Sequence, residues 1–188
     1  LNFQKNLSLR PYNTFGINVQ SKRFIGAKTT QELQYILSQK KDEKILILGG
    51  GSNLLLTRDF EGLTLRIESR GIEIIREDEE SVTVKVAAGE NWHKFVLWCL
   101  ENNFGGVENL ALIPGSVGAA PIQNIGAYGS ELKYVFSSCE AISISNGTIK
   151  TFSKAACQFR YRNSIFKNEL KDQYVITSVN FLLNKAPH

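Results

Sequence analysis

The residues best suited to hold a ligand lie in two glycine-rich stretches. The first, Gly49-Gly50-Gly51-Ser52-Asn53, follows an apolar run, and the second occupies residues 112–129. From Pro114 to Gly129 the second stretch contains two prolines and four glycines, with neither a helical nor a strand period. Because glycine loses more backbone freedom on folding than any other residue, such a stretch is costly to order. We expect it where the backbone passes close to a ligand, so the two stretches predict two walls of one groove.

The chemistry that the first stretch favours is phosphate binding by the backbone. Consecutive small residues after a strand can point several N–H groups into one concavity, and Ser52 and Asn53 can add side-chain donors. Two common phosphate motifs are not met: Leu54 stands where the dinucleotide fingerprint needs its third glycine, and no Gly-Lys-Ser/Thr follows. A tight turn that needs glycine explains this cluster equally well by itself, and the second glycine stretch favours a ligand.

Composition and charge exclude several function classes. The chain has 188 residues, 43% of them hydrophobic and 21% charged, with a net charge of +4, which is ordinary for a globular protein. Its basic residues are scattered rather than gathered in one stripe, which argues against nucleic-acid binding. No apolar run approaches the ~20 residues that cross a bilayer, so we expect no membrane association. A small positive excess suits an anionic small molecule.

The three cysteines indicate the compartment. Cys99, Cys139 and Cys157 are odd in number and lack the CxxC spacing of zinc sites. Free thiols are typical of a reducing compartment. We therefore expect no disulfide framework, no metal and a cytoplasmic protein.

The periodicity predicts an α+β fold of two lobes, residues 1–70 and 71–188, with the glycine stretches between them. The first lobe is α/β, with strands at 24–27, 44–48 and 63–67 and a helix that Thr29 or Thr30 caps and that runs to about Lys41. The second lobe is α+β. Its predicted strands are 72–75, 82–86 and 174–183.

Two further elements of the second lobe carry specific predictions. An amphipathic helix over 91–103 places its apolar residues three or four apart, and Gly105-Gly106 ends it. A hairpin over 139–153 turns at Asn146-Gly147, a sequence suited to a type I′ turn. His93, on the helix, has no ligand partner at helical spacing, so we expect a structural or exposed histidine. Glu90, beside the helix start, is more simply a loop residue than a ligand contact.

Five separated segments carry a recognisable pattern. They are Asn13-Thr14-Phe15-Gly16-Ile17, residues 47–54, Ala88-Gly89-Glu90-Asn91-Trp92-His93, residues 108–129 and residues 157–167. Together they resemble the UDP-N-acetylenolpyruvoylglucosamine reductase family. The resemblance runs in order from about Leu7 to Leu183, and coincidence over five segments is implausible.

The resemblance implies FAD held between two lobes, in a fold shared with vanillyl-alcohol-oxidase-type flavoproteins. By this likeness, the first glycine stretch would hold the pyrophosphate through its amides and the second would line the flavin. NADPH would reduce the flavin, which would then reduce the enolpyruvyl group of a UDP-sugar to give UDP-N-acetylmuramate. The cofactor-binding residues implied are Gly49, Gly50, Gly51, Ser52, Asn53, Leu54, Ser116, Ala119, Ile122, Gln123, Gly126 and Tyr128.

Arg162 matches the active-site arginine of the family. A planar guanidinium can grip a carboxylate through two parallel hydrogen bonds while hydride addition pushes negative charge onto it. From composition alone, an arginine beside Tyr161 is more simply a surface residue. The match of residues 157–167 to the family favours an active-site role instead. The same resemblance implies peptidoglycan synthesis, hence roles in cell wall biogenesis, cell shape and cell division, in the cytoplasm.

The sequence departs from the family near its C-terminus. The family's proton donor is a serine in a Gly-Ser-Phe-Phe-Lys-Asn-Pro segment, assisted by a later glutamate, and neither segment occurs here. We therefore expect a truncated FAD-binding fragment that lacks the substrate lobe and is itself inactive. Two alternatives stay open: another FAD-dependent oxidoreductase of the same two-lobed fold, or a non-catalytic nucleotide-binding module.

Overall fold

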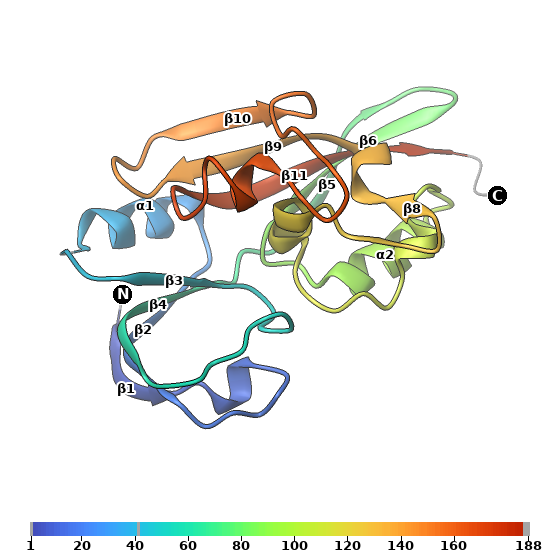
Figure 1. Cartoon of the computed structure of the whole chain (residues 1–188). Coiled ribbons are helices and arrows are strands. Elements are labelled where there is room, and N and C mark those ends of the chain that lie inside the picture. Colours follow the sequence, from blue (N-terminus) through green and yellow to red (C-terminus); the bar gives the residue numbers. More distant parts are fainter. Residues whose placement is uncertain (1, 41, 186–188) are drawn as a thin grey trace.

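Two β-sheets form the frame of the molecule in this computed structural model, which describes residues 2–40 and 42–185 (Figure 1). The first sheet has the order β1-β2-β4-β3. Strands β1 and β2 are antiparallel, whereas β4 runs parallel to both β2 and β3. Its strands are β1 (Gln4–Ser8), β2 (Gln20–Ala27), β3 (Ile45–Leu48) and β4 (Phe60–Ile67). The sequence analysis predicted the last three of these strands and missed β1.

Helix α1 (Thr30–Ser38) connects β2 to β3, as a parallel arrangement requires. Thr29 is its N-cap, and the Thr29 side chain accepts a hydrogen bond from the Glu32 amide at 3.1 Å. Its apolar residues Leu33, Ile36 and Leu37 lie three or four positions apart on one face, and they are buried. The helix ends at Ser38, and Lys41, to which we expected it to extend, lies outside the described residues.

The second sheet is antiparallel throughout, with the order β10-β9-β11-β6-β5. In β6, Val82, Val84 and Val86 are fully buried and alternate with half-buried polar residues, so one face packs on the core. The predicted strands and hairpins are all present. The strands are β5 (Ile72–Glu77), β6 (Ser81–Ala87), β9 (Phe136–Ser143), β10 (Ile149–Ser153) and β11 (Tyr174–Asn184).

The turn between β9 and β10 differs from the type I′ turn that we predicted. A type I′ turn needs positive φ at both central residues, and of Asn146 and Gly147 only Gly147 has one, at 71°. The Ser143 amide bonds to the Thr148 carbonyl, and the Gly147 amide bonds to the Ser143 carbonyl, both near 2.9 Å. The strands are therefore joined by a longer loop over 144–148.

Helix α2 (Trp92–Glu101) ends earlier than the predicted glycine stop. Asn91 caps its start, with its side chain accepting from the Lys94 amide at 3.0 Å. At the other end Asn103 takes the left-handed conformation, with φ 57°, directly after the C-cap Asn102. Asn103 thus has the role that we assigned to Gly105-Gly106, because asparagine tolerates the left-handed region.

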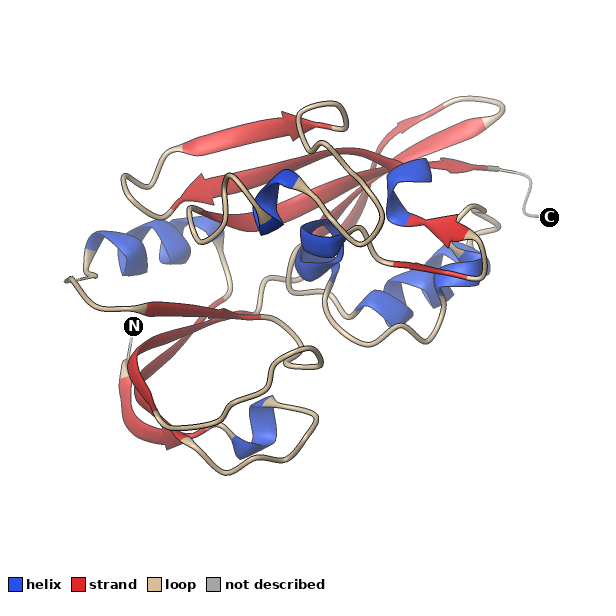
Figure 2. Cartoon of the chain, viewed as in Figure 1, coloured by secondary structure: helices blue, strands red, loops and turns tan. Residues whose placement is uncertain are grey.

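The two sheets share part of their core. The larger apolar cluster lies between the second sheet and α2. A smaller cluster joins Leu33 and Ile36 of α1 to Ile142 of β9 and Val175 of β11, so α1 packs between the sheets (Figure 2). The first sheet uses residues 4–67 and the second residues 72–184. Division into lobes at residue 71 stays a prediction.

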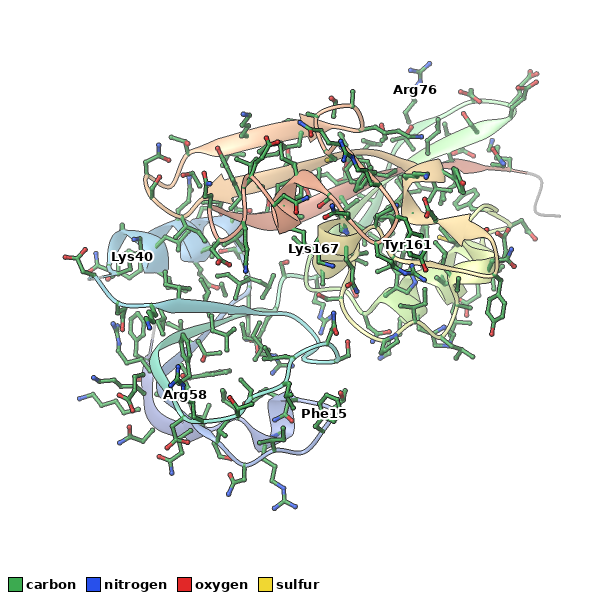
Figure 3. The ribbon with its side chains drawn as sticks, viewed as in Figure 1. Phe15, Lys40, Arg58, Arg76, Tyr161 and Lys167 are labelled. Atoms are coloured by element: carbon green, nitrogen blue, oxygen red, sulfur yellow. The ribbon has the colours of Figure 1, made fainter. Side chains whose placement is uncertain are left out.

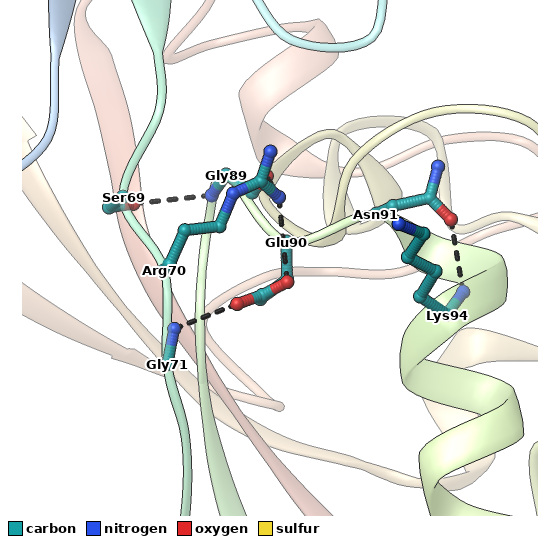
Figure 4. A network of polar contacts seen from close by, with 7 residues as sticks. All are labelled: Ser69, Arg70, Gly71, Gly89, Glu90, Asn91 and Lys94. Carbon is teal, nitrogen blue, oxygen red and sulfur yellow. Dashed lines mark hydrogen bonds and ion pairs between the residues drawn. The ribbon is translucent and has the colours of Figure 1, made fainter.

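The segment that joins the sheets is fixed to the loop before α2 (Figure 4). The Gly89 amide donates to the Ser69 hydroxyl at 3.2 Å, and the Gly71 amide donates to the Glu90 carboxylate at 2.8 Å. Arg70 also pairs with Glu90 at 3.4 Å. A Cβ at Gly89 would lie 2.5 Å from the Ser69 carbonyl oxygen, so only glycine fits this crossing. Glu90 therefore has the structural role that we favoured.

Within residues 2–40 and 42–185, no helix combines the length and apolar character that a membrane span requires.

Candidate cofactor-binding site

Two adjoining cavities lie between the sheets, each of about 650 Å³. The first lies beside β3 and β11, and the second lies between the two glycine stretches. Both have the size of typical small-molecule sites. They are contiguous, because five residues line both: Ile47, Gly49, Ser116, Ala119 and Ile122.

The second cavity brings together residues far apart in the sequence. Its walls come from residues 47–54, residues 113–126 and three residues outside these segments, Trp92, Arg162 and Lys167. All the site residues predicted from the sequence line it, except Tyr128. Those residues are Gly49, Gly50, Gly51, Ser52, Asn53, Leu54, Ser116, Ala119, Ile122, Gln123, Gly126 and Arg162.

The backbone amides of the first glycine stretch are candidate donors to an anion in this cavity. Among the residues that the structure describes, no acceptor receives a hydrogen bond from the main-chain N–H of any residue from Gly49 to Asn53. Gly49, Gly51 and Ser52 are buried or half-buried, and amides at such positions are normally paired. Successive unpaired amides at a cavity wall form a concavity that suits an anion.

The glycines themselves are required by contacts within the protein. A Cβ at Gly49 would lie 2.5 Å from the Ser116 hydroxyl, and one at Gly50 would lie 2.9 Å from Gly115 Cα. Gly51 has a φ of 66°, and its Cβ would lie 1.9 Å from the Tyr12 carbonyl oxygen. Glycine therefore permits a close approach between the first stretch and its protein neighbours. The contacts of Gly49 and Gly50 with the second stretch bring the two cavity walls together.

The second glycine stretch forms a 3-10 helix, Val117–Gln123, which contacts the first stretch across the cavity. The Asn53 side-chain amide donates to the Gln123 side-chain oxygen at 3.3 Å. Gly118 packs directly on Ala88, where a Cβ would lie 2.5 Å from the Ala88 Cβ. The helix ends at Asn124, which has a φ of 45°.

Asn124 connects three parts of the site. Its side-chain oxygen accepts from the Lys133 amide at 3.0 Å. Its side-chain amide donates to the Arg160 carbonyl at 3.0 Å and to the Glu131 carboxylate at 3.1 Å. Asn124 is fully buried, so it fixes the cavity wall to the loop that carries Arg162.

Tyr128 lies at the tip of the hairpin formed by β7 (Gly126–Ala127) and β8 (Ser130–Glu131). Tyr128 and Gly129 have φ values of 49° and 79°, the positive pair that a type I′ turn requires. The tyrosine side chain is 88% exposed and does not line either cavity. Tyr128 thus lies two residues after Gly126, which lines the second cavity, but Tyr128 itself is not part of the cavity wall.

Arg162 occupies the end of a two-residue loop. The amides and carbonyls of Arg160 and Asn163 bond to each other at 3.0 and 3.1 Å and close the loop. Arg162 has a φ of 51°, a conformation that non-glycine residues adopt mainly at constrained positions. Its guanidinium donates to the Gly126 carbonyl. A guanidinium has five N–H donors, so this contact leaves others for a ligand.

The charges around this loop are arranged in pairs. The Lys133 ammonium donates to Glu131 and holds the pKa of that carboxyl below its usual value, and nearby Arg162 lowers it further. The same contact raises the pKa of Lys133. The residues that line the second cavity include no carboxylate. The cavity therefore carries two positive charges, those of Arg162 and Lys167.

Sequence reasoning missed Asn124 and Lys167. Both lie within segments that carry the family resemblance, and only this position in the sequence could have pointed to them. Lys167 was one scattered basic residue among many, and Asn124 carries no charge. Their roles depend on contacts over long sequence separations.

The cysteines take no part in the site. Cys99, Cys139 and Cys157 are free and fully buried. Burial raises the pKa of the Cys99 thiol, which therefore stays protonated and a poor nucleophile. Among the described residues, no group of His, Cys, Asp and Glu side chains is arranged to hold a metal.

Comparison with known proteins agrees with this geometry. The FAD binding domain family matches residues 21–153. The UDP-N-acetylenolpyruvoylglucosamine reductase of Flavobacterium johnsoniae is 55% identical over 100% of this chain and 56% of its own length. The enzyme of the same name from Pseudomonas aeruginosa is 47% identical over 98% of this chain and 55% of its own length. The chain thus spans about half the length of these relatives.

Solved structures show the same fold at lower identity. The UDP-N-acetylenolpyruvylglucosamine reductase of Thermus caldophilus aligns with a TM-score of 0.81 at 21% identity, over 99% of this chain and 64% of its own. A p-cresol methylhydroxylase aligns with a TM-score of 0.64 at 17% identity, over 93% of this chain and 38% of its own. A VAO-type flavoprotein from Myceliophthora thermophila aligns with a TM-score of 0.65 at 16% identity, over 89% of this chain and 32% of its own. The predicted α+β fold of the vanillyl-alcohol-oxidase type is confirmed.

The matched family, the high identity over the whole chain and the shared fold point to one assignment. The chain belongs to the FAD binding domain family, and within it to the FAD-binding part of UDP-N-acetylenolpyruvoylglucosamine reductases.

Proposed function

We propose that the two contiguous cavities hold one molecule of FAD, with its diphosphate at the amides of Gly49 to Asn53. The observation that carries this proposal is the set of successive amides that have no acceptor among the described residues and belong to the wall of the second cavity, whose lining includes no carboxylate. Backbone amides and nearby cations are the donors that a diphosphate prefers.

The rest of the groove suits the other parts of the cofactor. Ile47, Ala119 and Ile122 line both cavities and offer apolar surface to planar rings. Ser116 adds a hydroxyl at the same boundary. Ligand sites of this kind are mostly apolar with a few placed polar groups.

We further propose that the chain is the flavin-holding part of a reductase of peptidoglycan precursor synthesis in the cytoplasm. Bound FAD would supply hydride transfer, with NADPH as the source of the hydride. The substrate would be UDP-N-acetylglucosamine enolpyruvate, and the product UDP-N-acetylmuramate. The names and identities of the relatives support this assignment.

Arg162 would bind the carboxylate of the enolpyruvyl group. Its guanidinium lines the second cavity, and its bond to the Gly126 carbonyl fixes one edge. The remaining N–H groups can form two parallel hydrogen bonds to a carboxylate, which strengthen as negative charge develops there. The serine proton donor that the family resemblance implies has no counterpart in residues 1–188, so we propose that this chain alone does not complete the reaction.

Calorimetric titration of the chain with FAD, ADP and riboflavin tests the cofactor proposal. We expect FAD to bind, and riboflavin to bind at least about tenfold more weakly because it lacks the diphosphate, whose charge-assisted hydrogen bonds are the strong ones. Ala119→Leu should fill the boundary of the two cavities and lower FAD affinity. Ala155→Leu, at an exposed position outside both cavities, is the matched control. Equal affinity for FAD and riboflavin, or unchanged FAD binding in Ala119→Leu, would contradict the proposal.

A further inference from the structure

Lys167 is a cation of the second cavity to which the sequence assigned no role. It ends the 3-10 helix Ile165–Lys167, on the side of the second sheet that faces the first (Figure 3). It lines the cavity together with Arg162 and with residues 49–53. Within the described residues, Lys167 forms no ion pair, whereas Lys133 is paired with Glu131.

The Lys167 ammonium is bonded to the backbone of Arg162. Its Nζ donates to the Arg162 carbonyl oxygen at 3.1 Å. That carbonyl belongs to a residue with a φ of 51°, a conformation that is unfavourable for a residue with a Cβ. A hydrogen bond from a charged donor is stronger than one between neutral groups. The contact therefore helps to hold the main chain of Arg162 in this conformation.

The Arg162 side chain is fixed at its other end. Its guanidinium donates to the Gly126 carbonyl, and a Cβ at Gly126 would lie 2.9 Å from Arg162 Nη1. Lys167 thus holds the main chain of Arg162, and Gly126 holds its guanidinium against the cavity wall. If the main chain turned, the guanidinium would lose its direction toward the cavity.

We infer that Lys167 is a positioning residue for Arg162 and the second charge of a carboxylate-binding pair. The inference rests on the proposed function, because the carboxylate is the one that Arg162 would hold. Lys167 acts through its hydrogen bond to the Arg162 carbonyl, and its charge adds to the attraction for the same anion. Removal of the ammonium releases the Arg162 loop and weakens carboxylate binding.

The test uses the FAD-free chain and the side-chain Nε–H resonance of Arg162 in ¹⁵N–¹H spectra. Acetate is the carboxylate probe, and pyrophosphate is a parallel arm that reports on the diphosphate site. Lys167→Met removes the donor and the charge, and Lys167→Arg keeps both. Lys154→Met removes an exposed lysine outside the cavity and is the control. Thermal unfolding of each variant shows that the fold is retained.

We expect Lys167→Met to shift and broaden the Arg162 resonance and to weaken acetate binding about tenfold, the equivalent of one lost charge-assisted hydrogen bond. Lys167→Arg should restore both, and Lys154→Met should match the wild type. An unchanged Arg162 resonance and acetate affinity in Lys167→Met would overturn the inference. So would equal effects from Lys167→Met and Lys154→Met, or a loss of pyrophosphate binding alone.

Failure of the proposed function gives a different result. If the chain takes no FAD, calorimetry shows it directly. The dependence of the Arg162 resonance on Lys167 is measured without FAD and does not change with that outcome.

Discussion

Replacing Asn124 should cost more stability than its single side chain suggests. Asn124 is fully buried, and its side chain forms three hydrogen bonds of 3.0 to 3.1 Å to Lys133, Arg160 and Glu131. It also has a φ of 45°, in the left-handed region. Asn124→Ala removes all three bonds and places in this conformation a residue that tolerates it less well.

The magnitude follows from these two effects. Each lost hydrogen bond contributes about 1 kcal/mol net, and the left-handed conformation costs alanine about 1 kcal/mol. We therefore expect Asn124→Ala to lower the free energy of unfolding by about 4 kcal/mol. Asn124→Gly removes the same bonds without the strain and should be about 1 kcal/mol less damaging.

Urea unfolding at pH 7, followed by tryptophan fluorescence, measures both variants against the wild type. The comparison of alanine with glycine separates the backbone effect from the hydrogen bonds. A loss below about 1 kcal/mol in Asn124→Ala would refute the reasoning on the hydrogen bonds. A glycine variant less stable than the alanine variant would refute the reasoning on strain.

The remaining predictions use the same measurement. Gly49→Ala should destabilise the chain, because its Cβ would lie 2.5 Å from the Ser116 hydroxyl, and Ser116→Ala in the same chain should restore most of the loss; additive losses would contradict this. Glu131 has a lowered pKa, chiefly through Lys133, so its stabilising effect is present above the usual carboxyl pKa and is lost as pH falls through the lowered value. Glu131→Gln should therefore make the urea midpoint depend less on pH in the acid range, and an unchanged acid dependence would be the contrary result. Thr29→Ala should cost about 1 kcal/mol through loss of the α1 cap, and a variant as stable as the wild type would show that the cap is not needed.

The elements that could be predicted from the sequence are those with a local cause. The β6 strand follows from its alternating valines, and the start of α1 follows from Thr29 before an apolar stripe. The helix over 91–103 was correct in kind but not in its stop signal. We predicted that the helix stops at Gly105-Gly106, whereas Asn103 adopts the left-handed conformation that ends the helix two residues earlier.

The site could be predicted only where the chain carries a pattern. The segments that carry the family resemblance contain every residue that lines the second cavity, and the site residues named within them are 12 of the 21. They could not give Lys167 or Asn124, because each acts through partners that the fold brings together. Tyr128 lies inside a motif but is exposed to solvent, so its role at the cofactor stays a prediction.

The first glycine stretch was open to two explanations, a tight turn or a ligand site, and its residues do not share one explanation. Gly51 is the turn: its φ is positive, and a side chain there would collide with the Tyr12 carbonyl. Gly49 and Gly50 have no positive φ, and they let the wall at Gly115 and Ser116 come close. The turn and the close packing together leave successive amides that have no hydrogen-bond acceptor within the described residues. A sequence that needed only a turn would require one glycine, so the two additional glycines serve the close packing of the cavity walls, and the unpaired amides are the feature that favours a ligand.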